Sequence, residues 1–466
     1  MRTCFCSICF LVAHLVAAQH YSTVNFKSSD PVLDSGFAWA KRQALMYVHH
    51  GGDPVGPWYE ASLPGRDAFC MRDVSHQLTG ANMLGLSHIN RNLLTKFVSS
   101  VGATRDWCGY WEIDKMDRPA PVDYTNDQDF WYNLPANFDV LNACYRQLEW
   151  TGERYVFDSL FQEFYIKTLD DYVQRWDTDR DGVMEGTASS VYPNRGIGSY
   201  NEGQNGMTGN DLIAAQYLGN ISYLKLLERM GKLTERKYNK RATELWRAFH
   251  ATWWNTSGFY EQFRTRDGKW LRNDPMQLLL LRWDFVPADR GALIVKNLLR
   301  QVGEMNVEML SYFPREAFRY GDSESATNLL NTLTSPGLAR REYPEVSFAA
   351  LEAFAEGLMG IEAHAPDNSV RSLARLPKAL SFARIEHLPV IGADISIEHR
   401  GESKSILINH SNHAISWDAC LYSNGKTPLV NGKRRNGLRS VDVNGRGYVT
   451  IRLEVAPGGR VEVEVK

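Results

Sequence analysis

Residues 211–230 read DLIAAQYLGNISYLKLLERM, and apolar side chains fall on more than one face of the helix that this stretch predicts. A helix of this kind needs partners on both sides. Similar segments, separated by connectors rich in Gly, Pro and Asn, continue from position 31 to position 361. About a dozen helices in this alternation predict a mainly α fold, a toroid of helical hairpins.

The helical periodicity gives approximate bounds for each element. The predicted helices cover residues 31–50, 73–101, 134–151, 155–176, 209–230, 234–254, 288–302, 323–333 and 346–361. The run LLLLRW after Gln277 predicts one further buried helical turn.

The pattern changes near residue 375. Stretches such as ADISIEHRG (393–401), YVTIRLEVAPGG (448–459) and RVEVEVK (460–466) alternate with a period of two and are separated by Gly or Asn turns. We therefore expect an antiparallel β-sandwich over residues 376–466, after a helical catalytic domain over residues 19–375.

The N-terminal segment is typical of a targeting sequence. Arg2 is followed by the apolar run CFCSICFLVAHLVAA, which ends in small residues and is too short to span a bilayer comfortably. We expect a signal peptide over residues 1–18, and a secreted or periplasmic protein.

Charge and cysteine content exclude several classes of partner. The 52 basic and 54 acidic residues give a net charge of -2, which provides no broad field for nucleic acid or acidic lipid. The cysteines that follow the signal segment are far apart and form no CxxC pair, so they predict neither a particular disulfide nor a zinc site. We expect no metal and no cofactor, and the sequence does not indicate the oligomeric state.

Residues 106–142, DWCGYWEIDKMDRPAPVDYTNDQDFWYNLPANFDVLN, combine many acids and amides with aromatic rings. A pyranose has an apolar face that stacks on Trp or Tyr, and its hydroxyls need acceptors once water is removed. This stretch therefore predicts a groove that binds a neutral carbohydrate.

Four connectors carry the unusual residues. They cover positions 57–73, 111–135, 192–211 and 335–346, and each one precedes a predicted helix. Loops that repeatedly precede helices on alternate hairpins gather on one face of a toroid. We expect the binding cleft on that face.

Several motifs, in this order, resemble the six-hairpin glycosidase clan, which includes glucoamylases, amylo-α-1,6-glucosidases and α-L-rhamnosidases. DYTNDQDFWYNLPANFDVLN (123–142) is similar to an aromatic and acidic segment of debranching-type enzymes, and RWDTDRDGVMEG (175–186) to a common DxDxDG turn. SYNEGQNGMTGND (199–211) resembles the glucoamylase loop with the general acid, and REYPEVSFAALEAFAEG (341–357) the closing helix. The resemblance covers most of residues 30–362 and implies an (α/α)6 toroid.

The resemblance does not identify the sugar on which this chain would act. The arginine-rich acidic motif of the rhamnosidase acid is absent from the sequence, and the glucoamylase base region has no close match. The resemblance therefore implies a glycoside hydrolase of the clan, and an inverting mechanism.

Direct displacement at a glycosidic bond needs a protonated carboxyl and a carboxylate that activates water. We expect Glu202 as the acid, because it matches the glucoamylase pattern, with Asp211 as a rival that also suits a helix cap. We expect Glu345 as the base, with Glu342 as the alternate. Each of these acids could also be a solvated or capping residue.

Further residues are expected to bind sugar hydroxyls or to stack on a ring. They are Trp58, Glu60, Arg72, Asp73, Trp111, Asp127, Asp129, Trp131 and Asp211. The alternatives for these residues are a structural Arg-Asp ion pair, acids at a helix start and tryptophans in the core. His76 is expected to be buried or to act as a cap rather than to bind metal.

Two other functions fit the same sequence. A polysaccharide lyase on a similar toroid needs a Tyr/His or Lys base and a positive groove. A non-catalytic glycan-binding protein needs only the aromatic groove. The turn that begins at Asp177 imitates a calcium loop, but position twelve is Ala188 where an EF-hand needs Glu, so we expect a structural turn.

Overall fold

A computed structural model describes residues 22–186, 195–201, 207–232, 236–265, 267–271, 277–423 and 425–466. The predicted signal segment, residues 1–18, lies outside these ranges. Within the described ranges, no helix has the length and apolar character that crossing a bilayer requires.

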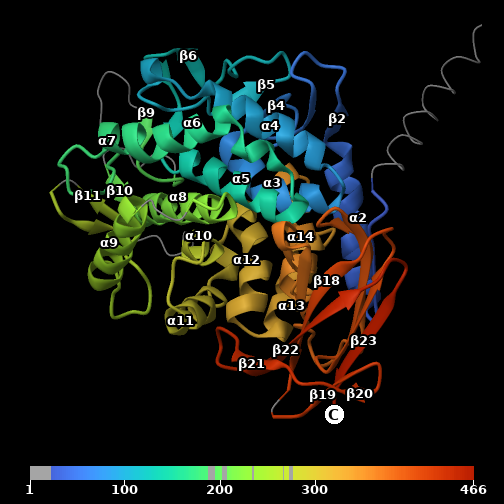
Figure 1. Cartoon of the computed structure of the whole chain (residues 1–466). Coiled ribbons are helices and arrows are strands. Elements are labelled where there is room, and N and C mark those ends of the chain that lie inside the picture. Colours follow the sequence, from blue (N-terminus) through green and yellow to red (C-terminus); the bar gives the residue numbers. More distant parts are fainter. Residues whose placement is uncertain are drawn as a thin grey trace, which may run out of the picture.

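Helices make up most of the chain between residues 31 and 358 (Figure 1). They are α2 (Pro31–Met46), α3 (Met71–Met83), α4 (Ser87–Ser100), α5 (Ala136–Thr151), α6 (Ser159–Lys167), α7 (Val173–Trp176), α8 (Asn210–Arg229), α9 (Arg236–Thr252), α10 (Gln277–Arg282), α11 (Ala288–Leu298), α12 (Val307–Tyr320), α13 (Ser323–Thr334) and α14 (Pro344–Glu352). Two π-helical stretches, Thr168–Tyr172 and Ala353–Leu358, extend α6 and α14.

Among these helices, a set packs in a closed ring. Helix α3 packs against α5, α5 against α8, α8 against α10, α10 against α12, α12 against α14, and α14 against α3 again. Other helices cover this ring from outside: α4 lies against α3 and α5, α9 against α8, α11 and α13 against α12, and α2 against α13 and α14. The double-sided apolar pattern of residues 211–230 follows from this arrangement, because α8 contacts ring neighbours as well as α9.

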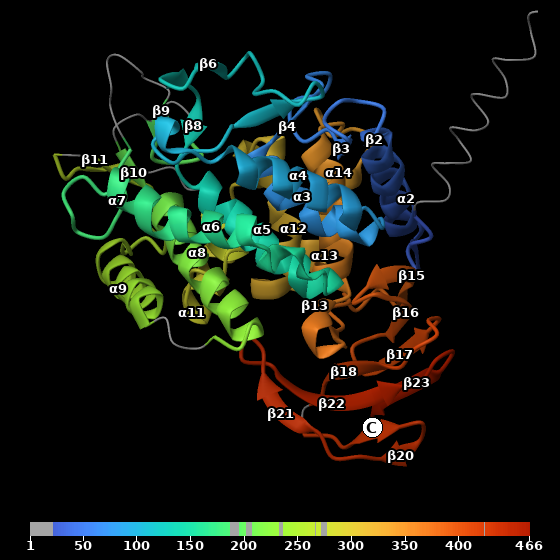
Figure 2. The same ribbon diagram turned by 45° about the horizontal axis from the view of Figure 1, so that its top comes forward.

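Two larger sheets form a β-sandwich-like region beside the helices (Figures 1 and 2). The first has the order β1 (Asn25–Ser28), β15 (Ala383–Val390), β16 (Ala393–Arg400), β17 (Lys404–Asn409), β23 (Arg460–Val465), β19 (Pro428–Val430) and β20 (Lys433–Arg434). The second has the order β13 (Glu362–His364), β14 (Ser369–Leu373), β18 (Ile415–Tyr422), β22 (Gly447–Val455) and β21 (Leu438–Val441).

The pairing in these sheets is antiparallel except between β14 and β18, which run parallel. The β-region also includes β13 and β14, which precede residue 376, and β1, which lies near the N-terminal end of the described chain. Phe26 of β1 packs against Phe37 of α2 and against Phe354, with ring centroids 5.6 and 4.8 Å apart. The helices and the sheets therefore share one apolar core.

Short strands lie on one side of the helical region, at the top of Figures 1 and 2. They are β2 (Val48–His50), β3 (Pro57–Tyr59), β4 (Ala68–Cys70), β5 (Glu112–Asp114), β6 (Tyr124–Asn126), β7 (Asp129–Phe130), β8 (Tyr132–Asn133) and β9 (Arg195–Ile197). A separate small sheet holds β10 (Met207–Gly209), β11 (Phe263–Thr265) and β12 (Trp270–Leu271).

Two differences from the predicted helices have clear physical causes. The predicted helix 73–101 is divided into α3 and α4, because Gly85 turns the chain with a φ of +78°. Helix α12 was not predicted, and it contains Pro314, which has no N–H to donate to the preceding turn. The four cysteines of the described chain are buried and unpaired.

A buried ion cluster joins four helices of the ring. Glu352 of α14, 1% exposed, accepts a hydrogen bond from Arg282 of α10 at 2.8 Å and another from Arg146 of α5. Arg315 of α12 lies 3.8 Å away. Burial by itself would raise the pKa of Glu352, but the charges of Arg282, Arg146 and Arg315 hold it below its usual value.

We predict that Glu352→Ala lowers the free energy of unfolding by about 3–5 kcal/mol, because it leaves the buried guanidinium of Arg282 without its ion-pair partner. Urea denaturation followed by circular dichroism measures this loss. The matched control is Glu362→Ala, which removes a half-exposed partner 3.5 Å from Arg371 and should cost less than about 1 kcal/mol. Similar losses in the two variants would contradict the central role of Glu352.

Candidate functional site

A cavity of about 710 Å³ lies among the connectors that carry the short strands. Each of the four predicted connectors contributes lining residues to it, as do the start of α12 and the turn before it. The cavity lies at the N-terminal ends of α3, α12 and α14, where the helix dipoles favour negative charge.

The first carboxyl pair in the cavity is Asp73 and Glu345. Asp73, in the first turn of α3, accepts a hydrogen bond from Arg72 Nε at 2.9 Å. Glu345 lies in the first turn of α14 and is 5% exposed. Burial, and next the charge of Asp73, raise the pKa of Glu345 well above its usual value, while Arg72 acts in the opposite direction. Burial raises the pKa of Asp73 as well, with Arg72 acting against the shift. Glu345 therefore keeps its proton to a higher pH than a solvent-exposed Glu would, and Arg72 favours the charged form of Asp73.

A chain of buried hydrogen-bonding groups continues from Glu345 into the ring. Tyr312 Oη lies 3.2 Å from Glu345 Oε2 and 2.9 Å from His76 Nδ1. His76 Nε2 lies 2.7 Å from Asp139 Oδ2, which also accepts a hydrogen bond from the Tyr200 hydroxyl at 3.0 Å. All five side chains are at most 5% exposed.

The single phenolic proton of Tyr312 couples Glu345 to His76. Two arrangements of the hydrogen bonds are possible. In one, His76 donates from Nδ1 to the Tyr312 oxygen, and Tyr312 donates its proton to Glu345. In the other, Tyr312 donates its proton to Nδ1 of neutral His76 and accepts a hydrogen bond from protonated Glu345. Burial, together with the charges of Arg282 and Arg72, lowers the pKa of His76. The hydrogen bond from Tyr312 to ionised Glu345 opposes the rise in the pKa of Glu345, and it requires His76 to donate from Nδ1.

The second carboxyl pair is Glu112 and Asp123. Glu112 is 4% exposed and lies 2.6 Å from Arg66 Nη1, and Asp123 Oδ2 lies 3.8 Å from the same atom. Burial, and then the charge of Asp123, raise the pKa of Glu112 to about 7, against the opposing effect of Arg66. Glu112 therefore holds a proton over part of the neutral range.

The structure brings five of the residues predicted for the site into this one cavity: Arg72, Asp73, Trp111, Trp131 and Glu345. Trp111 and the neighbouring Tyr200 are almost fully buried, with ring centroids 6.2 Å apart. The predicted acid, Glu202, lies outside the described residues, although Asn201 lines the cavity. Glu342 is exposed and is not a lining residue.

Two predicted residues near β3 do not line the cavity. Trp58 is fully buried, donates to Asp53 Oδ2 at 2.7 Å and stacks on His49 with a centroid distance of 4.1 Å. Its ring faces are thus occupied by protein. Glu60 accepts a hydrogen bond from the backbone of Gly65 at 3.2 Å, so it stabilises the loop that leads into the cavity.

The acids around Gln128 also lie away from the cavity lining. Asp127 accepts hydrogen bonds from Thr104, from Tyr124 at 2.6 Å and from Arg105 at 2.8 Å. These contacts outweigh its partial burial and lower the pKa of Asp127 to about 2. Asp129 is exposed on β7.

Asp211 supports the site without lining it. The side chain is fully buried, and it accepts hydrogen bonds from the backbone N–H of Tyr200 at 2.6 Å and from the Ser199 hydroxyl at 3.0 Å. Burial raises the pKa of Asp211 to about 6, while these hydrogen bonds oppose the shift. Asp211 therefore fixes the segment that carries Tyr200 into the cavity.

Several lining residues were not predicted from the sequence. Glu112 and Asp123 lie inside the acidic and aromatic stretch 106–142, so composition alone could have indicated them. Glu308 and Tyr312 come from α12, which was not predicted. The sequence feature that could have indicated the start of this helix is its N-cap residue, Asn306, whose Oδ1 accepts a hydrogen bond from the N–H of Met309 at 2.8 Å.

In the described chain, two groups of side chains could hold a metal ion, and neither lines the cavity. Asp177, Asp179, Asp181 and Glu185 lie together in the turn after α7. The turn itself uses these acids, since Asp177 accepts from the N–H of Gly182 and Glu185 from Thr178. The second group, in the β-region, consists of His387, Asp394 and His410.

No family model and no curated protein matches this chain. Solved structures match it at low identity. An alpha-L-rhamnosidase from Dictyoglumus thermophilum aligns with a TM-score of 0.61 at 12% identity, over 96% of this chain and 50% of that chain. An alpha-L-rhamnosidase from Aspergillus terreus aligns with a TM-score of 0.59 at 11% identity, over 96% and 50%.

A protein from the human microbiome, assigned as a kojibiose phosphorylase, aligns with a TM-score of 0.59 at 9% identity, over 98% of this chain and 70% of that chain. The fold of this chain is that of six-hairpin glycosidase-like enzymes. The chain spans half the length of the two rhamnosidases.

We predict that Glu345→Gln changes how stability depends on pH. A carboxyl whose pKa is raised by folding stabilises the protein fully below its unfolded pKa, about 4.3, and that contribution is lost as pH rises toward the folded pKa. The wild type should therefore lose stability between pH 5 and pH 8, and Glu345→Gln should lose less. Urea midpoints at the two pH values measure the difference.

The matched control is Glu342→Gln, which removes an exposed carboxyl three residues earlier. It should keep the pH dependence of the wild type. A Glu345→Gln variant with an unchanged pH dependence would show that Glu345 has an ordinary carboxyl environment.

Proposed function

We propose that this chain is a glycoside hydrolase that cleaves a neutral oligosaccharide or glycoside by carboxylate acid/base catalysis with inversion. The observation that carries the proposal is the Asp73–Glu345 pair, in which burial and Asp73 raise the pKa of Glu345, in a cavity lined by Trp111, Trp131 and Tyr200. Buried carboxyls with shifted pKa values provide the groups that glycosidic cleavage needs, and aromatic rings provide stacking surfaces for sugars.

Each lining residue has a role in this proposal. Glu345 acts as the base that activates water, once it has lost its proton. Asp73 and Arg72 bind sugar hydroxyls at the floor of the cavity. Glu202 remains the predicted acid, and Glu112 is a second candidate for that role because burial and Asp123 raise its pKa to about 7.

The charge of the cavity supports a neutral substrate. Among the described residues, the cavity is lined by six acids, Asp73, Glu112, Asp123, Glu304, Glu308 and Glu345, and by three arginines, Arg66, Arg72 and Arg340. A lyase acting on a uronate needs a positive groove to offset the substrate carboxylate. The excess of acids favours hydrolysis of a neutral sugar over elimination.

The helix ring supports a fold proposal as well. We infer that α3, α5, α8, α10, α12 and α14 form the inner layer of an (α/α)6 toroid and that the remaining long helices form its outer layer. This arrangement fits a division into a helical catalytic domain up to residue 375 and a β-sandwich domain from residue 376. Strands β1, β13 and β14 belong to the helical part of the sequence but pair within the two larger sheets.

We predict that Glu345→Gln lowers turnover of aryl glycosides at least about 100-fold, because a positioned base contributes about 10²–10⁴-fold. The loss should be the same for good and poor leaving groups, since water activation does not depend on the leaving group. A variant that lacks the general acid should behave differently, because a good leaving group departs without being protonated. Its defect should shrink with dinitrophenyl glycosides.

Comparing Glu202→Gln with Glu112→Gln in this assay identifies the acid as the variant whose defect shrinks. Glu342→Gln should keep wild-type rates. An anomer assay by NMR and a product assay for ultraviolet absorption separate inversion, retention and elimination. Sugar binding without turnover in the parent protein, unaffected by Glu345→Gln, would instead support a glycan-binding protein.

The pH profile tests the role of Glu345 separately. A base is active when ionised, so the raised pKa of Glu345 should place the acidic limb of kcat/KM above the usual range for Glu. The Tyr312 hydrogen bond lowers this pKa, so Tyr312→Phe should move the acidic limb to higher pH. Movement of the alkaline limb instead would identify Glu345 as the acid.

A further inference from the structure

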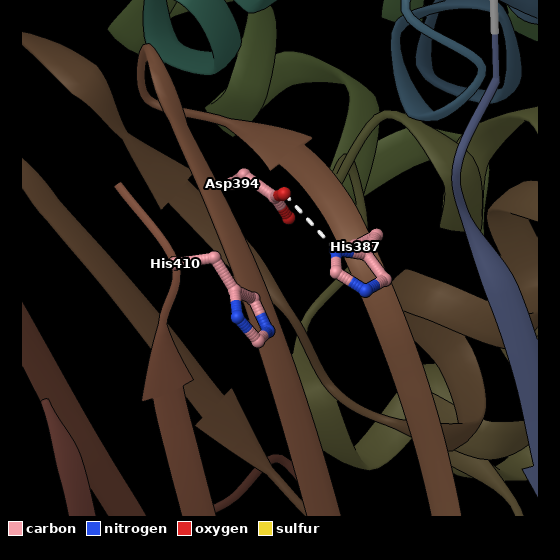
Figure 3. A group of neighbouring side chains, drawn as sticks. All are labelled: His387, Asp394 and His410. Carbon is pink, nitrogen blue, oxygen red and sulfur yellow. Dashed lines mark hydrogen bonds and ion pairs between the residues drawn. The ribbon is translucent and has the colours of Figure 1, made fainter. Parts of the chain in front are cut away.

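A second polar cluster lies in the β-region, outside the cavity. His387 belongs to β15, Asp394 to β16, and His410 directly follows β17. These three strands are neighbours in one sheet, and the backbone N–H of His410 donates to the carbonyl of Asp394 at 2.8 Å. Figure 3 shows the three side chains on one face, with the His387 ring directed toward Asp394 and the His410 ring beside it.

A β-bulge places His387 on this face. The register between β15 and β16 shifts between Ile385 and Leu388, both of which are fully buried. In a regular strand with a period of two, position 387 would face inward with Ile385. The bulge inserts one residue, so His387 lies on the exposed face, with a φ of +53°, and Leu388 returns to the core.

Hydrogen bonds orient the cluster but leave lone pairs available. Asp394 Oδ2 lies 3.0 Å from His387 Nδ1. Oδ1 of Asp394 is shielded from solvent and has no hydrogen-bond partner among the described residues. Ser396 Oγ lies 2.8 Å from His410 Nε2, and the two imidazole rings stack with centroids 4.6 Å apart.

We propose that His387, Asp394 and His410 form a binding site for a divalent first-row transition cation such as Zn²⁺. Two imidazoles and one carboxylate are a ligand set that this ion takes with a solvent molecule in the fourth position. An ion there would satisfy Asp394 Oδ1, which otherwise lacks a partner. With Nδ1 of His410 as the ligand, Nε2–H donates to Ser396, as metal-binding histidines commonly do toward an outer partner.

The spacing of the side chains fits such an ion after a small rotation. One ligand atom from each residue lies within 4.8 Å of the others. Bonds of about 2.0–2.1 Å in a tetrahedron separate ligand atoms by about 3.4 Å. His387 and His410 are exposed, so their rings can move closer without displacing the core. The strands hold the three backbone positions fixed.

The site would act as a structural clip rather than as part of catalysis. It joins three adjacent strands where the β15–β16 turn contacts the helices: Trp150 Nε1 donates to the carbonyl of Pro389 at 2.9 Å, and Ile391 N–H donates to the carbonyl of Trp150 at 2.8 Å. Bound metal should therefore stabilise the junction between the sheets and the ring. This inference does not depend on the proposed glycosidase activity.

The test is calorimetric titration of Zn²⁺ into the full chain, prepared without a polyhistidine tag and freed of metal with a chelator. We expect one Zn²⁺ per chain, and at least about 10-fold weaker binding in His387→Ala and in His410→Ala. Zn²⁺ should raise the melting temperature of the wild type, because it binds the folded state, and should leave that of the double variant unchanged. Co²⁺ should give the intense visible bands of a tetrahedral site.

His413→Ala is the matched control, because His413 is exposed in the same turn but outside the cluster. It should bind Zn²⁺ like the wild type. Circular dichroism checks that each variant is folded. The proposal is overturned if the wild type binds no Zn²⁺ below about 1 mM, or if the double variant His387→Ala/His410→Ala binds it as well as the wild type.

Discussion

One buried carboxylate, Glu352, holds the helix ring together by charge. Three guanidinium groups from three other ring helices approach it, and none of them can lose its proton. Glu352 is the carboxylate that pairs with Arg282, while Arg146 and Arg315 also pair with Glu356. Arg282 extends the cluster to α3, since its Nη2 donates to the carbonyl of His76 at 3.0 Å. The same contacts that close the ring therefore fix the backbone at His76, beneath the cavity floor.

The cavity combines side chains from the ring helices with side chains from the connectors. Asp73, Glu345 and Tyr312 stand on ring helices, whereas Trp111 and Trp131 come from the connectors around the short strands. Burying Asp73 and Glu345 together costs stability, and the chain retains the pair although apolar residues would pack there at lower cost. Burial and the neighbouring carboxyl raise the pKa of Glu345, and carboxyls with shifted pKa values in a polar cavity are typical of sites that transfer protons.

Much of the fold could be predicted from local pattern. Most of the helices and the change to strands near residue 375 follow from periodicity, which depends on neighbouring residues alone. Helix α12 could not be predicted in this way, because Pro314 interrupts its pattern and packing against α10, α13 and α14 compensates for the missing hydrogen bond. Trp58 and Asp127 show the opposite case. Their residue types fit a sugar-binding site, but other side chains of the protein already contact the Trp58 ring and the Asp127 carboxylate.

By itself, the sequence determined the types of secondary structure, the order of helices and strands, and the connectors that gather the unusual residues. Those properties depend on side chains a few positions apart. The tertiary structure alone decided which acids meet: Glu345 with Asp73, Glu112 with Asp123, and His387 with Asp394 and His410. Proton sharing and metal binding depend on separations of a few ångströms between distant segments, and these separations arise only when the ring closes and the strands pair.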